Sequence, residues 1–254
     1  MTDEGLRISD LSVTFGGLVA VDHVTLAAPT GMVTGLIGPN GAGKTTTFNA
    51  CTGTVPVSAG QVNFLGRQIS HFSPARRAQA GLGRTFQRME LFDSMTVAEN
   101  VALGAEAGLA GRRLWSHFVS SPAQRKEIVE RTEFALSECG LEHLQTWRVR
   151  SLSTGHRRLV ELARALASQF RFLLLDEPSS GLDRTETERF AEIISRSTGS
   201  GLGILLVEHD MALVREVCAY VHVLDFGKLI FAGTMAQVQD SEIVRRAYLG
   251  SEAA

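Results

Sequence analysis

The chain has 254 residues, of which 44% are hydrophobic and 20% charged, and its formal net charge is -2. This composition is sufficient for a substantial core and argues against disorder, and the near-neutral charge gives no reason to expect nucleic acid as a partner. The cysteines Cys51, Cys139 and Cys218 are an odd number and contain no C-x-x-C pair. We therefore expect buried thiols in a reducing compartment rather than disulfides or a zinc site.

The first ten residues, MTDEGLRISD, contain acidic side chains and lack the basic and apolar segments of a signal peptide, so export is not expected. The longest apolar runs, at 172–175 and 204–207, are much shorter than the roughly 20 residues that cross a bilayer as a helix. Any attachment to a membrane would therefore depend on a partner protein.

The first part of the chain is predicted to form β-structure. Residues 6–15, 21–28 and 32–37 have the composition of strands, and Gly16 and Gly17 predict a hairpin-like turn between the first two. The pattern changes from strands to helices further along the chain.

Residues about 88–157 are predicted to be mainly helical. The sequences T-V-A-E at 96–99 and S-P-A-Q at 121–124 are capping boxes, in which side chains bind the free N–H groups of a helix start. Beyond them, the apolar runs at 172–175, 204–207 and 220–224 alternate with helical stretches, which is typical of a parallel sheet covered by helices. The pattern predicts an α/β core interrupted by a helical insertion.

Residues 38–45, G-P-N-G-A-G-K-T, match the P-loop pattern G-x-x-x-x-G-K-[ST] between a predicted strand and a predicted helix. The glycines let backbone N–H groups point at phosphates, and Lys44 and the helix N-terminus add positive potential. The hydroxyl of Thr45 is predicted to bind Mg²⁺. A glycine-rich turn without function is the alternative, which the flanking strand and helix disfavour.

Residues 171–177, R-F-L-L-L-D-E, form an apolar run that ends in two carboxylates. In a P-loop protein such a strand end meets the metal of the nucleotide. Asp176 is predicted to hold Mg²⁺, directly or through water, and Glu177 to polarise the water that attacks the γ-phosphate. The alternative is an ordinary acidic turn. Together the two motifs predict a P-loop NTPase and leave open a kinase, a GTPase or a helicase.

The segment L-S-T-G at 152–155, followed by an apolar helical pattern about 20 residues before Asp176, resembles the LSGGQ-type signature of ABC ATPases. The resemblance implies that Ser153 and the adjacent N–H groups grip the γ-phosphate bound by a second subunit. It also implies a fold: an α/β P-loop NTPase core with an antiparallel β subdomain and an inserted helical subdomain. We predict one ABC ATPase domain over residues 1–254, with its core at about 1–87 and 158–254.

Further segments resemble elements of the family in the family's order. The resemblance implies that Gln87 contacts the metal and the attacking water, that Asp183 reaches across the dimer, and that His209 contacts the γ-phosphate. Phe15 would stack on adenine. The predicted ATP-binding residues are Phe15, Gly38, Pro39, Asn40, Gly41, Ala42, Gly43, Lys44, Thr45 and Thr46. The predicted catalytic residues are Glu177, His209 and Gln87, the metal ligands are Thr45, Gln87 and Asp176, the signature residues are Leu152, Ser153, Thr154, Gly155 and His156, and the D-loop residue is Asp183.

The resemblance covers essentially the whole chain and is closest to the LivG-like ATPase subunits of branched-chain amino acid importers. It rests on F-G-G-L-V-A-V (15–21), R-T-F-Q (84–87), M-T-V-A-E-N (95–100) preceded by L-F (91–92), V-E-H-D-M (207–211) and A-Y-L-G (247–250). It implies a peripheral protein at the cytoplasmic face of the cell membrane that uses ATP and Mg²⁺. The implied partners are permease subunits, a second ATPase subunit in a heterodimer, with a homodimer as the alternative, and, indirectly, an external solute-binding protein. Sister systems carry urea, amides or other small polar solutes, so the solute stays open.

Residues 84–95 are predicted to dock a cytoplasmic helix of the permease through Met89, Leu91, Phe92 and Met95, the alternative being that these side chains belong to the helical core. The sequence departs from the family at His156, which stands where glutamine is usual.

The sequence disfavours two rival classes of protein. A non-transport ABC protein would have a long coiled coil between Gln87 and Ser153, and no sustained heptads occur there. A small-molecule P-loop kinase would leave Ser153, Asp183 and His209 without a role.

Overall fold

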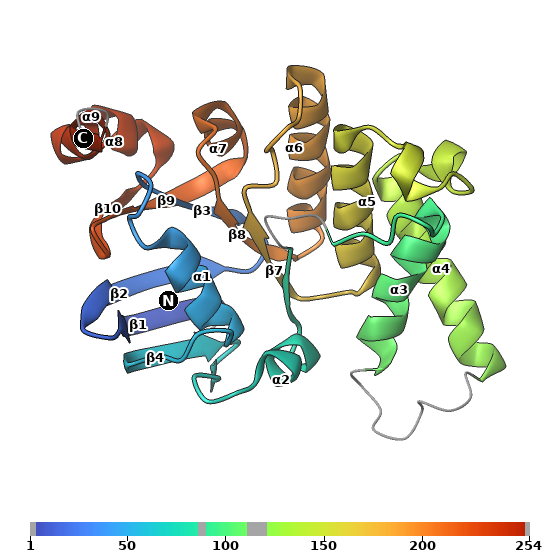
Figure 1. The fold of residues 1–254 in the computed structure, drawn as a ribbon, viewed down its shortest axis with the longest axis horizontal. Helices are drawn as coiled ribbons and strands as arrows, with labels where there is room; N and C mark the ends of the chain where they lie inside the picture. The colour runs from blue at the N-terminus through green and yellow to red at the C-terminus, as the bar shows by residue number, and fades with distance from the viewer. Residues whose placement is uncertain (1–3, 86–89, 111–120, 252–254) are drawn as a thin grey trace.

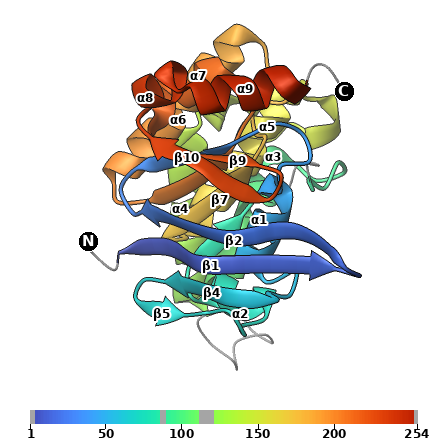
Figure 2. The ribbon, with the colours of Figure 1, turned by 90° about the vertical axis from the view of Figure 1, so that its left-hand side faces the viewer.

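The computed structural model describes residues 4–85, 90–110 and 121–251 (Figure 1). Its first sheet has four antiparallel strands in the order β2-β1-β4-β5. Their bounds are β1 (Gly5–Phe15), β2 (Leu18–Pro29), β4 (Ala59–Phe64) and β5 (Arg67–Gln68). In Figure 2 this sheet lies below β9 and β10. The predicted antiparallel β subdomain is therefore confirmed, although the sequence predicts only its first two strands, β1 and β2.

The second sheet has six strands in the order β10-β9-β3-β8-β7-β6, and all neighbours are parallel except β9 and β10. The bounds are β3 (Val33–Ile37), β6 (Leu82–Arg84), β7 (Phe172–Asp176), β8 (Gly203–Val207), β9 (Cys218–Asp225) and β10 (Lys228–Gly233). Every residue of β3, β7 and β8 is buried. These short apolar runs are covered on both faces, which explains why they lack the polar alternation of a half-exposed strand.

The helices of the core are α1 (Lys44–Thr52), α2 (Pro74–Gln79), α6 (Arg184–Gly199), α7 (Met211–Val217), α8 (Met235–Asp240) and α9 (Glu242–Ser251). The predicted helical region contains α3 (Val97–Ala110), α4 (Pro122–Glu138), two 3₁₀ turns (Glu142–Leu144 and Val149–Ser151) and the start of α5 (Thr154–Ala167). In Figure 1, α3 and α4 lie at one end of the molecule and α8 and α9 at the other.

Both predicted capping boxes are present. Thr96 N donates to Glu99 Oε2 over 2.7 Å and Glu99 N donates to Thr96 Oγ1 over 3.2 Å. Ser121 and Gln124 make the same pair of bonds at the start of α4. The boundary of the insertion near residue 157 stays a prediction, because α5 continues to Ala167 and packs against α3 and α4.

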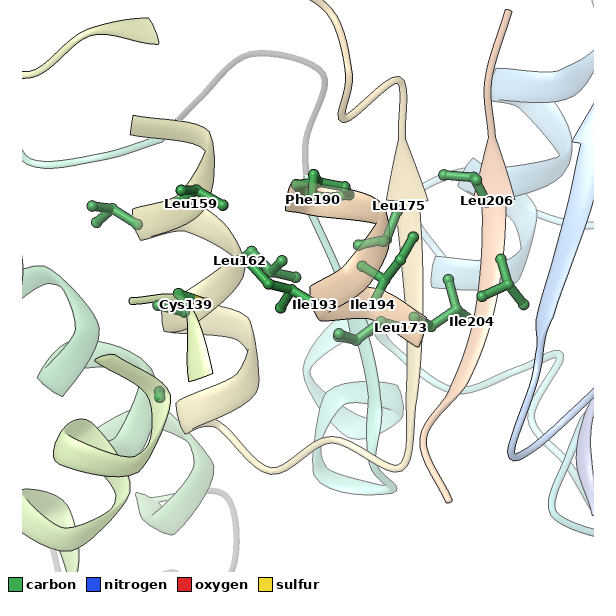
Figure 3. Close-up of a cluster of buried hydrophobic side chains, with 14 of the residues drawn as sticks. Cys139, Leu159, Leu162, Leu173, Leu175, Phe190, Ile193, Ile194, Ile204 and Leu206 are labelled. Carbon is green, nitrogen blue, oxygen red and sulfur yellow. The ribbon is translucent and has the colours of Figure 1, made fainter. Parts of the chain in front are cut away.

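The central sheet separates two apolar cores. Leu173 and Leu175 face the core that is shared with α5 and α6, where Leu162 and Ile193 pack (Figure 3). Leu174, between them on the strand, faces the opposite core, which is built from α1 and the four-stranded sheet. Alternate residues of one strand therefore join both layers to the sheet. None of the helices that the structure describes has the length and apolarity needed to span a membrane.

The three thiols provide a test of this packing. Cys51, Cys139 and Cys218 are buried and free, and burial raises the pKa of each thiol from its ordinary value to about 12. Because the thiolate is the reactive form, we expect iodoacetamide at pH 8 to alkylate the native protein about 10²–10³-fold more slowly than the urea-unfolded protein. Timed labelling with mass spectrometry measures these rates. A cysteine that reacts equally fast in both states would contradict its burial.

Candidate active site

The P-loop connects β3, which ends at Ile37, to α1, which begins at Lys44, so the predicted strand-loop-helix context is confirmed. At two positions of the loop, Gly38 and Gly43, there is no space for a side chain. A Cβ on Gly38 would lie 2.1 Å from Leu224 O, and one on Gly43 would lie 2.8 Å from Ala20 O. Gly38, Gly41 and Gly43 also have φ angles of 150°, 79° and 98°. Larger residues would be strained in this conformation, which curls the backbone at the helix N-terminus.

Lys44 lies against this loop. Its Nζ donates to Gly38 O over 2.6 Å and to Pro39 O over 3.0 Å, and the residue is only 8% exposed. Burial lowers the pKa of the Lys44 ammonium, and the charges of Glu177 and Asp176 oppose that shift. The cation is thus held at the loop by carbonyl oxygens and two nearby carboxylates, in a position to meet a polyanion.

A cavity of about 350 Å³ opens beside the loop. Its lining consists of Leu18, Val19, Ala20, Asn40, Gly41, Ala42, Gly43, Lys44, Thr45, Thr46, Glu177, Phe226 and Gly227. Seven of the ten predicted ATP-binding residues therefore share one cavity with the predicted catalytic Glu177. Gly38 and Pro39 are not among the lining residues but accept hydrogen bonds from Lys44 through their carbonyl oxygens, and Phe15 does not line the cavity either.

Asp176, the last residue of β7, is 2% exposed and forms an ion pair with Arg84. Arg84 Nη2 donates to Asp176 Oδ2 over 3.0 Å, and Arg84 Nη1 donates to Asn49 Oδ1 on α1 over 2.5 Å. Burial raises the pKa of the Asp176 carboxyl, and the Arg84 charge opposes this. Sequence reasoning assigned Arg84 no role, although an arginine directly before the predicted Q-loop is a usable signal.

The oxygens present fit Mg²⁺. The exposed Thr45 hydroxyl and the Asp176 carboxylate are hard oxygen ligands, and Mg²⁺ in nucleotide sites commonly takes one or two protein ligands together with phosphate and water oxygens. Gln87, the third predicted metal ligand, lies outside the described residues.

Glu177 follows Asp176 with a φ of 48°, in the left-handed region that a residue with a side chain rarely adopts. Its N–H donates to Val207 O over 2.9 Å, which continues the pairing of β7 with β8 by one residue. The backbone strain is retained at a residue that lines the cavity, and such outliers concentrate at functional sites.

The buried carboxylate of Glu208 was missed by sequence reasoning. Its Oε1 accepts from Ser179 N over 2.9 Å, and its Oε2 accepts from His209 N over 2.9 Å and from Asp210 N over 3.2 Å. Glu208 therefore joins the turn that follows Glu177 to the turn that carries His209. The His209 side chain is exposed and is not part of the cavity lining.

The predicted signature lies at the start of α5, where Ser153 is the N-cap and accepts from His156 N over 3.2 Å. Ser153 Oγ also lies 2.9 Å from His156 Nδ1, so His156 contacts the predicted phosphate-binding hydroxyl. A Cβ on Gly155 would lie 1.9 Å from Glu186 Oε1. Glu186 forms the capping box of α6 with Asp183, so the predicted signature and D-loop pack against each other. Neither segment lines the P-loop cavity.

The fold and this site define a P-loop ATPase of the ABC transporter family. The family described as ABC transporter matches residues 21–180, more than half of the chain, and the chain belongs to it. The protein accordingly binds ATP with Mg²⁺ and hydrolyses it, and it is an ATP-binding subunit of a transporter.

Individual relatives extend over nearly the whole chain. The high-affinity branched-chain amino acid transport ATP-binding protein BraF of Pseudomonas aeruginosa is 36% identical over 96% of this chain and 97% of its own length. LivG of Escherichia coli, named for the same transport, is 35% identical over 98% and 99%. The lipopolysaccharide export system ATP-binding protein LptB of Acidithiobacillus ferridurans is 36% identical over 98% of both. All three relatives are named as ATP-binding proteins, and their names give two different transported substances, branched-chain amino acids and lipopolysaccharide.

A solved structure supports the same family. The crystal structure of the ADP conformation of an ATP-binding cassette of an ABC transporter has a TM-score of 0.85 and 28% identity, and the match covers 97% of this chain and 99% of that one. The predicted fold class, an ABC ATPase with an antiparallel sheet and a helical region, is confirmed.

Replacing Lys44 tests the loop directly. We expect Lys44→Ala to weaken Mg·ATP binding by roughly 10- to 150-fold, because charge-assisted hydrogen bonds worth about 1.5–3 kcal/mol are lost. Isothermal titration calorimetry measures the affinity. Lys126→Ala, which removes an exposed cation on α4, is the matched control and should bind as the parent does. Unchanged affinity in Lys44→Ala would contradict the assignment of the P-loop.

Proposed function

We propose that this chain is the ATP-hydrolysing subunit of an ABC importer for branched-chain amino acids or a related small polar solute. The observation that carries the ATPase part is the shared cavity of the P-loop residues, Lys44 and the strained Glu177. The solute class is supported by the similarity of the whole chain to BraF and LivG.

The residues take the following roles in this proposal. The loop N–H groups and Lys44 would hold the phosphates, and Thr45 and Asp176 would hold Mg²⁺, which would supply positive charge to neutralise the phosphates. Glu177 would orient and polarise the attacking water, because this residue lines the cavity beside the P-loop. Arg84 holds the Asp176 carboxylate in place. Gln87, outside the described residues, would contact the metal and the attacking water, and His209 would contact the γ-phosphate.

A second ATPase subunit forms part of the proposal. Ser153 and the first N–H groups of α5 form an anion-binding helix start that does not line the cavity of its own chain. We assign its phosphate to the P-loop of a partner subunit, most simply a related ATPase. Asp183 lies beside the same surface and would reach across it.

The permease is assigned to the surface next to residues 84–95. A cavity of about 300 Å³ there is lined by Phe92, Arg84, Arg164 and Phe170, among others. Phe92 is 55% exposed, which is compatible with docking. Leu91 packs against the core, as the alternative of a core residue predicts. Met95 is partly buried, and Met89 lies outside the described residues. Attachment to the cytoplasmic face of the membrane would come from this contact.

An export subunit is the second candidate, favoured by the similarity to LptB. The two candidates differ in their partners and solutes. Tagged chain isolated with its membrane complex, followed by mass spectrometry and by uptake of labelled leucine in cells that lack the gene, separates them. An importer predicts permease partners and lost uptake of leucine or another small polar solute. Unchanged uptake of these solutes together with partners of a lipopolysaccharide export system would contradict the import proposal.

The catalytic assignment predicts the behaviour of Glu177→Gln. The carboxamide keeps the shape of the side chain but cannot accept a proton, so hydrolysis should fall about 10²–10⁴-fold, or roughly 3–5 kcal/mol of barrier. ATP binding should persist, because Lys44, Thr45 and the loop amides are unchanged. Phosphate release and calorimetry measure the two quantities. Turnover at the parent rate would remove Glu177 from the mechanism.

The same variant tests the shared site. Without hydrolysis, ATP should hold the ATPase pair closed, and size-exclusion chromatography with Mg·ATP and the partner should show the trapped dimer. Adding Ser153→Arg should abolish the trap and leave nucleotide binding intact, because a bulky cation then blocks the contact. A trap that persists with Ser153→Arg would contradict the shared-site proposal.

A further inference from the structure

The turn between β9 and β10 is fastened to the P-loop. Gly227 N donates to Ala42 O over 3.1 Å, and Asp22 N donates to Gly227 O over 2.8 Å. A Cβ on Gly227 would lie 2.8 Å from Ala20 O, the same carbonyl that a Cβ on Gly43 would meet. The turn, β2 and the P-loop therefore meet at backbone contact distance, and the residue before Gly227 is held at the nucleotide cavity.

That residue is Phe226, and its placement is not explained by packing. Its side chain is 87% exposed, which makes it the most exposed of the large apolar residues that the structure describes. Its φ of 43° lies in the left-handed region, where glycine or asparagine would cost less than a phenylalanine. A single exposed aromatic residue is common on protein surfaces. An exposed aromatic residue in a strained conformation that also lines a substrate cavity requires a further explanation.

The cavity lining has two chemistries. The loop amides, Lys44 and Thr45 suit a polyphosphate, whereas Leu18, Val19 and Phe226 are exposed apolar side chains. Phe15, the predicted adenine-stacking residue, pairs with Leu18 across the β1-β2 hairpin. ATP has the same division, with a charged end and a flat aromatic base, and the base offers π-faces on both sides.

We propose that Phe226 contacts the purine base of bound ATP and so belongs to the nucleotide-binding site. The strained turn presents the ring to the base, and the two backbone hydrogen bonds to β2 and the P-loop hold it at a set distance from the phosphates. Phe15 and Phe226 come from different parts of the chain, the β1-β2 hairpin and the β9-β10 turn, and together they give the base more aromatic surface than either alone.

The test separates contact with the base from support of the loop. Phe226→Gly removes the ring and fits the positive φ, so the turn keeps its conformation and thermal stability does not fall. Calorimetry with Mg·ATP should then show about 5- to 150-fold weaker binding, the range for the loss of one base-aromatic stack. Inorganic triphosphate with Mg²⁺, which has no base, should bind Phe226→Gly and the parent equally.

Two further variants complete the design. Phe226→Tyr keeps the ring and should retain parent affinity for ATP. Phe134→Ala removes an aromatic side chain that is 59% exposed on α4, away from the cavity, and should leave both affinities unchanged. Unchanged ATP affinity in Phe226→Gly would overturn the proposal. An equal loss for ATP and triphosphate, or a loss in Phe226→Tyr as large as in Phe226→Gly, would do the same, because either result assigns the effect to the turn rather than to the base.

Discussion

Backbone hydrogen bonds between β3, β8 and β7 determine where the chemistry of this protein is placed. Leu36 of β3 and Asp176 of β7 both pair with Val207 of β8. Because the three strands are parallel and in this register, the P-loop, Glu177 and Glu208 leave the sheet at one edge. The register is well specified, because Leu174 packs in one core and its neighbours Leu173 and Leu175 pack in the other. A slip of one residue would place each of these side chains in the wrong core.

The charged groups at this edge are buried and would be costly if they lacked partners. Arg84 forms an ion pair with Asp176 and also donates a hydrogen bond to Asn49 on α1. Glu208 accepts hydrogen bonds from three backbone N–H groups. These bonds form two polar networks: one joins β6, the end of β7 and the P-loop helix, and the other joins the turns after β7 and β8. Satisfied networks of this kind favour a single geometry, which a site for phosphoryl chemistry requires. The apolar packing that sets the strand register and the buried polar hydrogen bonds therefore favour the same arrangement of the site.

The sequence contained the local features of this arrangement. The P-loop glycines, the capping boxes at Thr96 and Ser121 and the buried apolar strands each depend on neighbouring residues, and all are present in the structure. Contacts between distant segments were not predictable in this way: Arg84 and Asp176 are separated by 92 positions, and Ser179 and Glu208 by 29. No short pattern identifies such partners, because the fold brings them together. Likewise no pattern in the sequence indicates a role for Phe226, since its exposure and its φ depend on where the β9-β10 turn meets the P-loop.

The helical region is connected to the core by a contact that depends on the absence of a side chain. Gly155 allows the start of α5 to lie against Glu186 of α6, and Gly181 lies close to Thr154, where a Cβ would be 3.1 Å from the Thr154 methyl. Glu186 in turn caps α6 together with Asp183. The predicted signature and the predicted D-loop are therefore packed as one unit, although they lie at the starts of different helices. Since α5 also packs against α3 and α4, a displacement of the helical region would be transmitted to both segments together. The packing of α5 alone would then couple the proposed permease surface to the two predicted interface segments.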